Sequence, residues 1–299
     1  MELPVVNHKD YVAQIGDDHK FPINKFGELA KYLIDQKVVN KFHNPTPCSF
    51  ETLNRAHSKN YINDIKNKTL DKNAIKKIGF PLVDSVVQRS LVATGGTVLA
   101  SKLALNYGIA CNTAGGSHHA NYNGGAGYCV FNDVAVATHY LLDRGYANRI
   151  LIVDLDVHQG NGTAEIFQNN NTVFTFSMHG KSNYPFHKEK SDLDIALENG
   201  TEDAAYLSIL KETLPDLITK QQPDFIYYLC GVDVITTDKL GKLSLTIEGC
   251  KERDRFVLQT CKDLSIPVMC SMGGGYSPDI KIIIDAHANT FRLAQDIFF

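Results

Sequence analysis

The sequence has no long apolar run and no block of like charges, and each absence excludes a class of protein. No segment approaches the roughly 18 apolar residues that a membrane-spanning helix needs. The first ten residues contain no basic stretch followed by an apolar one, as a secretory signal would. With a net charge of −3 and Lys76-Lys77 as its longest basic cluster, the chain predicts no nucleic-acid surface and no anionic-membrane surface.

The seven cysteines also lack a Cys-x-x-Cys pair, and their number is odd. Several of them lie inside apolar runs. This pattern indicates reduced, buried thiols, as in an intracellular protein, rather than a disulfide framework. We therefore expect a soluble protein of the cytoplasm.

The length of the chain and the alternation of its apolar and amphipathic segments predict the class of fold. The 299 residues, 43% of them hydrophobic, fit a single α/β domain over 1–299 better than two small ones. From about residue 82, short apolar runs alternate with amphipathic segments, which predicts a parallel sheet covered on both faces. Residues 1–80 are less regular, with loops around one helix. We expect strands at 109–111, 150–155, 173–177, 225–230 and 268–271, and helices at 25–35, 83–105, 133–142, 203–220, 247–264 and 278–295.

The segment that begins at residue 150 reads Ile-Leu-Ile-Val-Asp-Leu-Asp-Val-His. Its polar residues Asp154, Asp156 and His158 are spaced i, i+2, i+4, so on an extended chain they share one face and can converge on one ion. A single acid at such a place usually caps the next helix. Three buried ionisable groups are different, because each is costly to bury unless a cation neutralises it. The pattern therefore favours a metal site.

Polar residues follow four of the predicted strands, and in an open parallel sheet such strand ends face one crevice. Asp156, His158 and Asp233 would form a three-ligand set that leaves a position open for water and substrate, as in a catalytic Zn²⁺ site. The oxygen-rich donors also suit Fe²⁺, Mn²⁺ or Co²⁺. The four segments are Gly115-Gly-Ser-His-His-Ala, 154–158, Gly231-Val-Asp and Met272-Gly-Gly-Gly-Tyr.

Four side chains fit acid–base chemistry at this crevice. His118 and His119 lie on a glycine-flanked loop, where one imidazole can take a proton and the other supply one. Asp154 would orient one of them, although helix capping or a structural cation also explains it. Tyr276 follows three glycines and would donate a hydrogen bond to an oxyanion. An isolated His pair is more often a surface feature, and a lone Tyr after glycines a loop anchor; only their combination favours catalysis.

The walls of a substrate channel are predicted with less support. Tyr128 with Gly127 would line a narrow apolar channel for a linear side chain, and Tyr184 would form the opposite wall near Gly274. An aromatic residue at such a place is about as often part of the core.

Read together, the four motifs resemble the zinc-dependent histone deacetylase family of the arginase/deacetylase superfamily. Ile78-Gly-Phe-Pro, Arg89 with Gly95-Gly96, and Gly200-Thr-Glu-Asp are most similar to the class IV branch and its bacterial relatives. The resemblance implies a three-layer fold with a central eight-stranded parallel sheet, and hydrolysis of N-ε-acyl-lysine in a protein or peptide.

The same resemblance implies roles for individual residues. It implies Zn²⁺ held by Asp156, His158 and Asp233, with Fe²⁺ or Co²⁺ as alternatives, and catalysis by His118, His119 and Tyr276 with Asp154 in support. It also implies a structural K⁺ or Na⁺ near Asp154, Asp156, His158, Ser177 and the backbone at Met178.

Two departures from the family pattern stand out. Asn161 occupies a position where many class I members have an aspartate behind the second histidine, so His119 is expected to titrate differently. Phe80-Pro81 occupies the stretch where class I enzymes carry the rim aspartate that grips the peptide backbone. Sequence specificity toward peptides is therefore open.

The mechanistic hypothesis is attack by a metal-activated water on an amide carbonyl polarised by the metal and Tyr276. The His118/His119 pair would move the protons, with His119 protonating the departing amine. The nearest alternative is an amidohydrolase of small N-acyl amines such as acetylpolyamines. A ureohydrolase needs more bridging aspartates for two manganese ions, and a non-catalytic binding module need not retain every proposed functional group. The acyl chain, the physiological substrate, the oligomeric state and the metal in the cell are not predicted.

Overall fold

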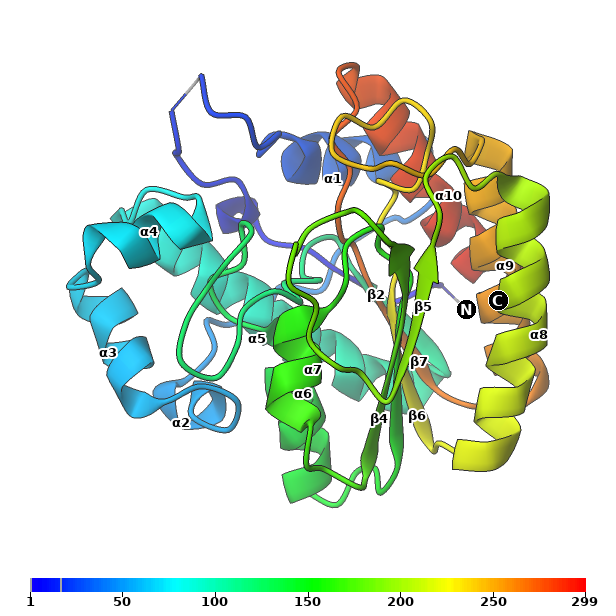
Figure 1. Cartoon of the computed structure of the whole chain (residues 1–299), viewed down its shortest axis with the longest axis horizontal. Coiled ribbons are helices and arrows are strands. Elements are labelled where there is room, and N and C mark those ends of the chain that lie inside the picture. The colour runs from blue at the N-terminus through cyan, green and yellow to red at the C-terminus, as the bar shows by residue number, and fades with distance from the viewer. Residues whose placement is uncertain (1, 17) are drawn as a thin grey trace.

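The computed structural model describes residues 2–16 and 18–299, and its centre is one sheet of seven parallel strands (Figure 1). The strand order is β1-β2-β7-β6-β3-β4-β5. The expected class, an α/β fold with a parallel sheet, is confirmed, whereas the expected number of eight strands is wrong. The strands are β1 (Val5–Val6), β2 (Ile109–Asn112), β3 (Ile150–Asp154), β4 (Val173–Gly180), β5 (Leu193–Leu197), β6 (Phe225–Leu229) and β7 (Val268–Ser271).

The two strands that the sequence did not predict, β1 and β5, form the edges of the sheet. β1 has only two residues, too few for a recognisable apolar run. β5 reads Leu-Asp-Ile-Ala-Leu and is only partly buried, because an edge strand has one neighbour and less cover. The central strands are fully buried on both faces, which explains why they stand out as continuous apolar runs.

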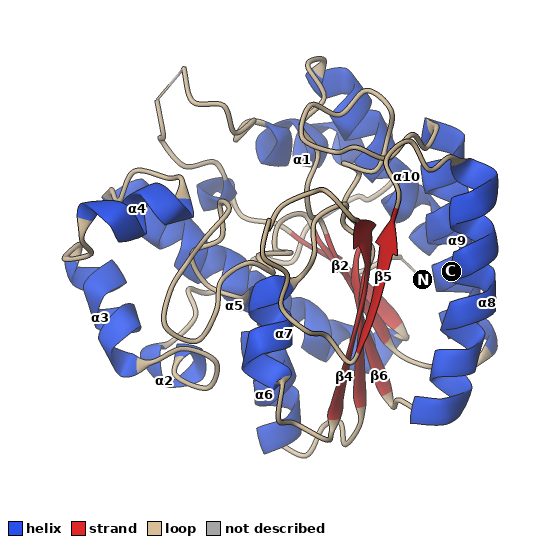
Figure 2. Cartoon of the chain, viewed as in Figure 1, coloured by secondary structure: helices blue, strands red, loops and turns tan. Residues whose placement is uncertain are grey.

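Helices cover both faces of the sheet (Figure 2). In the view of Figures 1 and 2, α5, α6 and α7 lie on one side of the strands and α8, α9 and α10 on the other, with α1 against α10. The helices are α1 (Lys25–Asp35), α2 (Phe50–Leu53), α3 (Lys59–Asn67), α4 (Lys72–Ile78), α5 (Asp84–Tyr107), α6 (Asp133–Asp143), α7 (Asn161–Phe167), α8 (Asp203–Gln221), α9 (Ile247–Asp263) and α10 (Ile280–Phe298), with a 3-10 turn at Lys9–Tyr11.

The expectation that residues 1–80 contain one helix is wrong, because α2, α3 and α4 also lie there. These helices are short and begin at capping side chains: the Ser58 hydroxyl accepts from Tyr61 N, and the Asp71 carboxylate accepts from Asn73 N and Ala74 N. They lie to one side of the sheet, beyond α5 and α6 (Figure 1). Helices of four to nine residues contain too few turns to give a clear apolar period.

The glycine pair within α5 permits close packing. A Cβ atom at Gly95 would collide with the Thr46 carbonyl, and one at Gly96 with the Tyr11 hydroxyl and the side chain of Asn112. Of the two explanations that a glycine pair inside a helix allows, close packing or a bend, close packing therefore applies here. The long helix thus lies directly against β2 and the N-terminal segment.

The register of the four central strands places their ends at one level. Asp154 of β3 is paired with Leu229 of β6, which is paired with Ser271 of β7, and Ser271 is paired with Asn112 of β2. The loops after these four strands therefore emerge side by side at the carboxyl edge of the sheet. This is the edge at which open parallel sheets bind ligands.

Two expectations from composition are tested by the structure. All seven cysteines are buried and none forms a disulfide, as expected. None of the helices in residues 2–16 and 18–299 combines the length and the apolar character that crossing a bilayer requires.

Candidate active site

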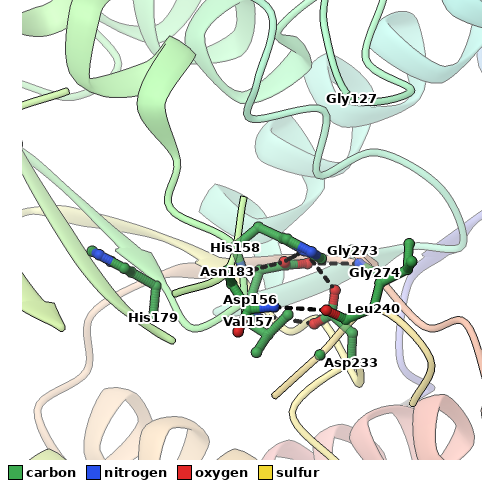
Figure 3. A network of polar contacts seen from close by, with 12 residues as sticks. Gly127, Asp156, Val157, His158, His179, Asn183, Asp233, Leu240, Gly273 and Gly274 are labelled. Carbon is green, nitrogen blue, oxygen red and sulfur yellow. Dashed lines mark hydrogen bonds and ion pairs between the residues drawn. The ribbon is translucent and has the colours of Figure 1, made fainter. Parts of the chain in front are cut away.

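Three potential metal ligands meet at the carboxyl edge of the sheet. Asp156 and His158 lie in the loop after β3, and Asp233 lies in the loop after β6 (Figure 3). One ligand atom from each lies within 4.8 Å of the other two. His158 Nδ1 is 3.0 Å from Asp156 Oδ1 and 3.1 Å from Asp233 Oδ2. The structure therefore brings together the three residues that the sequence predicted as one ligand set.

Backbone N–H groups fix the two carboxylates in place. Asp156 Oδ2 accepts from Gly274 N at 2.7 Å, and Asp233 Oδ1 accepts from Val157 N at 3.0 Å, as Figure 3 shows. A Cβ atom at Gly231 or Gly274 would collide with one of these carboxylates. The glycines of both motifs are thus required by the close approach of backbone to ligand.

The electrostatics of this group fit a cation. Asp233 Oδ2 is buried, and the described residues give it the ion-pair contact with His158 Nδ1 but no well-aligned hydrogen bond, which is costly for a charged oxygen. Burial and the neighbouring Asp156 raise the pKa of Asp233 to about 7. Burial opposes protonation of His158, but the carboxylates of Asp156 and Asp233 outweigh it and raise its pKa to about 10. A divalent ion among these atoms would replace the shared proton and satisfy the free oxygen.

The two adjacent histidines form a hydrogen-bonded chain beside the ligands. His118 Nδ1 lies 2.6 Å from Asp154 Oδ2, and His118 Nε2 lies 3.2 Å from His119 Nε2. His119 Nδ1 lies 2.7 Å from Asn161 Oδ1. Because an amide oxygen only accepts, His119 Nδ1 donates and its Nε2 is left with a lone pair. Asp154 therefore orients His118, as predicted, rather than pointing at the three ligands.

Their surroundings give the two imidazoles opposite charge preferences. Burial lowers the pKa of His118, but Asp154 and Asp156 more than compensate and raise it to about 9. For His119, burial together with the charges of His118 and His158 holds the pKa well below its usual range. In this environment His118 carries the positive charge and His119 is neutral.

Tyr276 faces the ligands from the loop after β7. Its ring lies 6.3 Å from that of His158, centroid to centroid. Burial, together with Asp233 and Asp156, raises the pKa of the phenol well above its usual range, so the hydroxyl remains a donor. Asp238 holds the backbone of this loop, because its Oδ2 accepts from Tyr276 N at 2.6 Å.

Two buried cations that the sequence analysis did not single out brace the site from behind. Lys25 of α1 is completely buried, and its Nζ donates to Gly273 O at 3.0 Å and Gly275 O at 3.4 Å. Burial lowers the pKa of Lys25 to about 8. Arg253 of α9 is also completely buried and donates from Nη1 to Leu155 O at 3.2 Å and Gly231 O at 2.7 Å.

Asp254 is the charge partner of Arg253. Its Oδ1 accepts from Arg253 Nε at 2.9 Å and Nη2 at 2.7 Å. Tyr228 donates to the same carboxylate, and Thr290 donates to Oδ2 at 2.6 Å. The guanidinium thus links the backbone just before Asp156 to the backbone just before Asp233, and its own charge is balanced within the core.

The channel predicted from the sequence is largely present. A cavity of about 390 Å³ leads to His119, His158 and Tyr276, and its lining includes Gly127, Tyr128 and Tyr184. The Tyr184 ring packs edge-on against His119 at 4.8 Å. Gly274 does not line this entrance. It lies instead on a smaller inner chamber of about 40 Å³ beyond the ligands, together with Phe21, Arg89 and Cys129.

The predicted structural-cation group is only partly assembled. Ser177 is paired with Asp154 across the neighbouring strands, but its hydroxyl is hydrogen-bonded to His179 Nδ1 at 3.0 Å. The Asp154 carboxylate is used by His118 and by Asp156 N. Backbone carbonyls near Met178 would have to supply most ligands, and the monovalent ion stays a prediction.

Comparisons with known proteins indicate the same family that the sequence motifs resemble. A model of the histone deacetylase domain family matches residues 19–290. An uncharacterized protein from Picosynechococcus sp. is 45% identical over the full length of both chains. Histone deacetylase 2 from Arabidopsis thaliana is 30% identical over 92% of this chain and 74% of its own.

A solved structure also resembles the fold. The HD domain of HDA15 superposes with a TM-score of 0.85, covering 99% of this chain and 88% of that one at 19% sequence identity. This likeness extends over the whole seven-stranded core. The chain belongs to the histone deacetylase family.

Loss of one carboxylate should abolish metal binding. We expect one divalent ion per chain in the metal-loaded protein and close to none in Asp233→Ala, because two remaining donors do not hold Zn²⁺. Metal analysis after gel filtration measures this, and the milder Asp233→Asn guards against misfolding. Asp296→Ala removes an exposed carboxylate and should keep the metal. A folded, metal-replete Asp233→Ala protein would contradict the ligand assignment.

Removal of the buried guanidinium should weaken both the fold and the site. Arg253→Met leaves Asp254 buried without its charge partner, so we expect a loss of about 3–5 kcal/mol in the free energy of unfolding. Urea unfolding measures the loss. Arg255→Met on the same helix removes an exposed arginine whose ion pair among the described residues is with Glu252, and it should change stability by less than about 1 kcal/mol. Equal effects of the two substitutions would exclude the bracing role.

Proposed function

We propose that this protein hydrolyses the side-chain amide of N-ε-acyl-lysine with the help of one divalent metal ion, Zn²⁺ in the first place. The supporting observation is that His119, His158 and Tyr276 line both the entrance cavity and the inner chamber, that His118 and Asp156 also line the inner chamber, and that Asp233 completes the ligand group directly behind them. Such a channel suits a linear side chain that enters end-on. Asp156, His158 and Asp233 would hold the ion, which when bound supplies Lewis acidity for the carbonyl and lowers the pKa of water.

The chain's own residues divide the proton transfers between them. Because His119 Nδ1 donates to Asn161, Nε2 is the basic nitrogen of this ring, and it takes the proton of the attacking water as the new carbon–oxygen bond forms. His118, charged and fixed by Asp154, adds positive potential beside the negative charge that develops on the carbonyl oxygen. Tyr276 donates its hydroxyl proton in a hydrogen bond to this oxyanion.

Collapse of the tetrahedral intermediate returns the proton. The His119 imidazolium donates from Nε2 to the lysine nitrogen as the carbon–nitrogen bond breaks, and the products are a carboxylic acid and the free amine. Asn161 keeps the proton of His119 on Nδ1 throughout, because the Asn161 amide oxygen faces Nδ1 and can act only as an acceptor. Water, amide, acid and amine balance without any other reactant.

The inner chamber supports a short acyl group. It measures about 40 Å³, room for a few waters or a small alkyl group rather than a long chain. Phe21 and Phe26 supply apolar walls, and the Arg89 guanidinium lies over Phe26 at 4.6 Å. An acetyl-sized group fits this space with its carbonyl directed back toward the ligands.

Removal of the phenol hydroxyl should lower turnover and leave the metal in place. For an acetyl-lysine peptide we expect Tyr276→Phe to reduce kcat by about 10²–10³-fold, the usual effect of losing one oxyanion donor. Steady-state kinetics with parallel metal analysis measures both. The wild-type protein should lose activity with chelator and recover it with Zn²⁺. Tyr146→Phe removes an exposed hydroxyl as the control, and an unchanged kcat in Tyr276→Phe would remove the phenol from the mechanism.

Exchange of the amide behind His119 should shift the pH profile. Asn161→Asp places a carboxylate 2.7 Å from Nδ1, which favours the imidazolium and raises the pKa of His119. The base must be neutral, so activity is lost as the pH falls through this pKa. The acidic limb of kcat/KM against pH should therefore move upward by about one unit or more. Asn171→Asp, at the amino ends of the strands, should leave the acidic limb of the pH profile unchanged. An unchanged acidic limb in Asn161→Asp would show that His119 is not the titrating base.

A further inference from the structure

The mouth of the channel is bordered by lysines from two distant parts of the chain. Lys76 and Lys77 come from the last turn of α4, and Lys242 comes from the loop between β6 and α9. All three are exposed. Among the described residues that line this cavity there is no aspartate or glutamate. The mouth therefore presents charge of one sign.

These positive charges are not used within the fold. The lysines of the described residues that form ion pairs are others, namely Lys68, Lys181, Lys220 and Lys251. Lys242 Nζ donates to the Ser182 carbonyl at 3.1 Å, which holds it at the mouth without neutralising it. Lysines in the last turn of a helix such as α4 also complement its dipole, but that local role does not account for Lys242.

The surface between the lysines suits a peptide. Phe186 is 86% exposed and lines the same cavity as Leu240 and Tyr184, so apolar contact area lies beside the charges. The mouth is about 390 Å³ against about 40 Å³ for the inner chamber. Residues on either side of an acylated lysine would lie over the outer part of the larger cavity, while the lysine side chain crossed that cavity and its acyl group reached the inner chamber.

We propose that the lysine-lined mouth selects acyl-lysines that are flanked by acidic residues in a protein or peptide. The proposal rests on the proposed function and adds the substrate class to it. Aspartate or glutamate beside the acylated lysine would meet Lys76, Lys77 and Lys242 with opposite charge, whereas a lysine- or arginine-rich segment or an acetylated polyamine would meet like charge.

The test uses matched acetyl-lysine peptides with the metal-loaded full-length protein. Two flanking positions on each side carry aspartate, glutamine or lysine, and N-acetylspermidine is a fourth substrate. At low salt we expect kcat/KM for the acidic peptide to exceed that for the basic one by about fivefold or more. The ratio should approach one as salt rises toward about 1 M, where screening is short-ranged.

Charge reversal at the mouth identifies the residues responsible. Lys76→Glu/Lys77→Glu and, separately, Lys242→Glu should each reduce the acidic-to-basic ratio, and the triple variant should invert it. Lys102→Glu makes the same charge change on α5, near the amino ends of the strands, and should leave the ratio unchanged. Far-ultraviolet circular dichroism and metal content check that each variant is folded and loaded.

The outcomes separate this inference from the function on which it rests. If no acyl-lysine peptide is hydrolysed, the proposed function fails. If the peptides are hydrolysed with equal kcat/KM, or if the basic peptide is preferred, the acidic selectivity is wrong and the deacylase function stands. A preference for N-acetylspermidine over every peptide would overturn both and favour an amidohydrolase of small N-acyl amines. A preference that survives the triple variant also overturns the assignment to these lysines.

Discussion

Two buried carboxylates within reach of one imidazole are the constraint on which the rest of the site depends. Asp156 and Asp233 are almost completely removed from water, and together with His158 they can be ionised there only if positive charge compensates them. One part of the compensation would come from the divalent ion that we propose among the ligand atoms. The other part of the compensation comes from peptide dipoles whose N–H groups face the acids and which buried cations polarise.

The peptide units around the ligands are polarised between fixed charges. Gly273 O accepts from Lys25 Nζ while Gly274 N, of the same peptide unit, donates to Asp156 Oδ2. Leu155 O accepts from Arg253 while Asp156 N donates to Asp154 Oδ1. In both cases a buried cation strengthens the dipole whose N–H faces an acid. Lys25 therefore stabilises the Asp156 carboxylate, and Arg253 the Asp154 carboxylate, through the backbone and without direct contact.

Sequence reasoning found the residues that share a strand end and missed those that act from behind. The sequence reveals Asp154, Asp156 and His158 because they interrupt a buried apolar run. It reveals Asp233 and Tyr276 because glycines precede them. Arg253 lies in a run of charged residues that is typical of a solvated helix face, yet the packing of α9 buries it. Lys25 begins an ordinary amphipathic helix. Only the three-dimensional position of α1 and α9 reveals that these two charges face inward.

The lysines at the mouth are a second example of residues whose common position the sequence pattern does not reveal, here on the outer surface. Lys76-Lys77 is too short a basic cluster to predict an electrostatic surface in a chain of net charge −3. The expected absence of a nucleic-acid or membrane surface, each of which needs an extended positive area, stays a prediction. A single narrow entrance needs much less. Three lysines fix the sign of the charge at this entrance, because none of the described residues in its lining is a carboxylate. In the selection that we propose, an acidic residue beside the bound acyl-lysine would lie close to them. The selectivity of such a mouth depends on which residues the fold brings to one opening, and Lys242 reaches it from a loop that no local pattern links to α4.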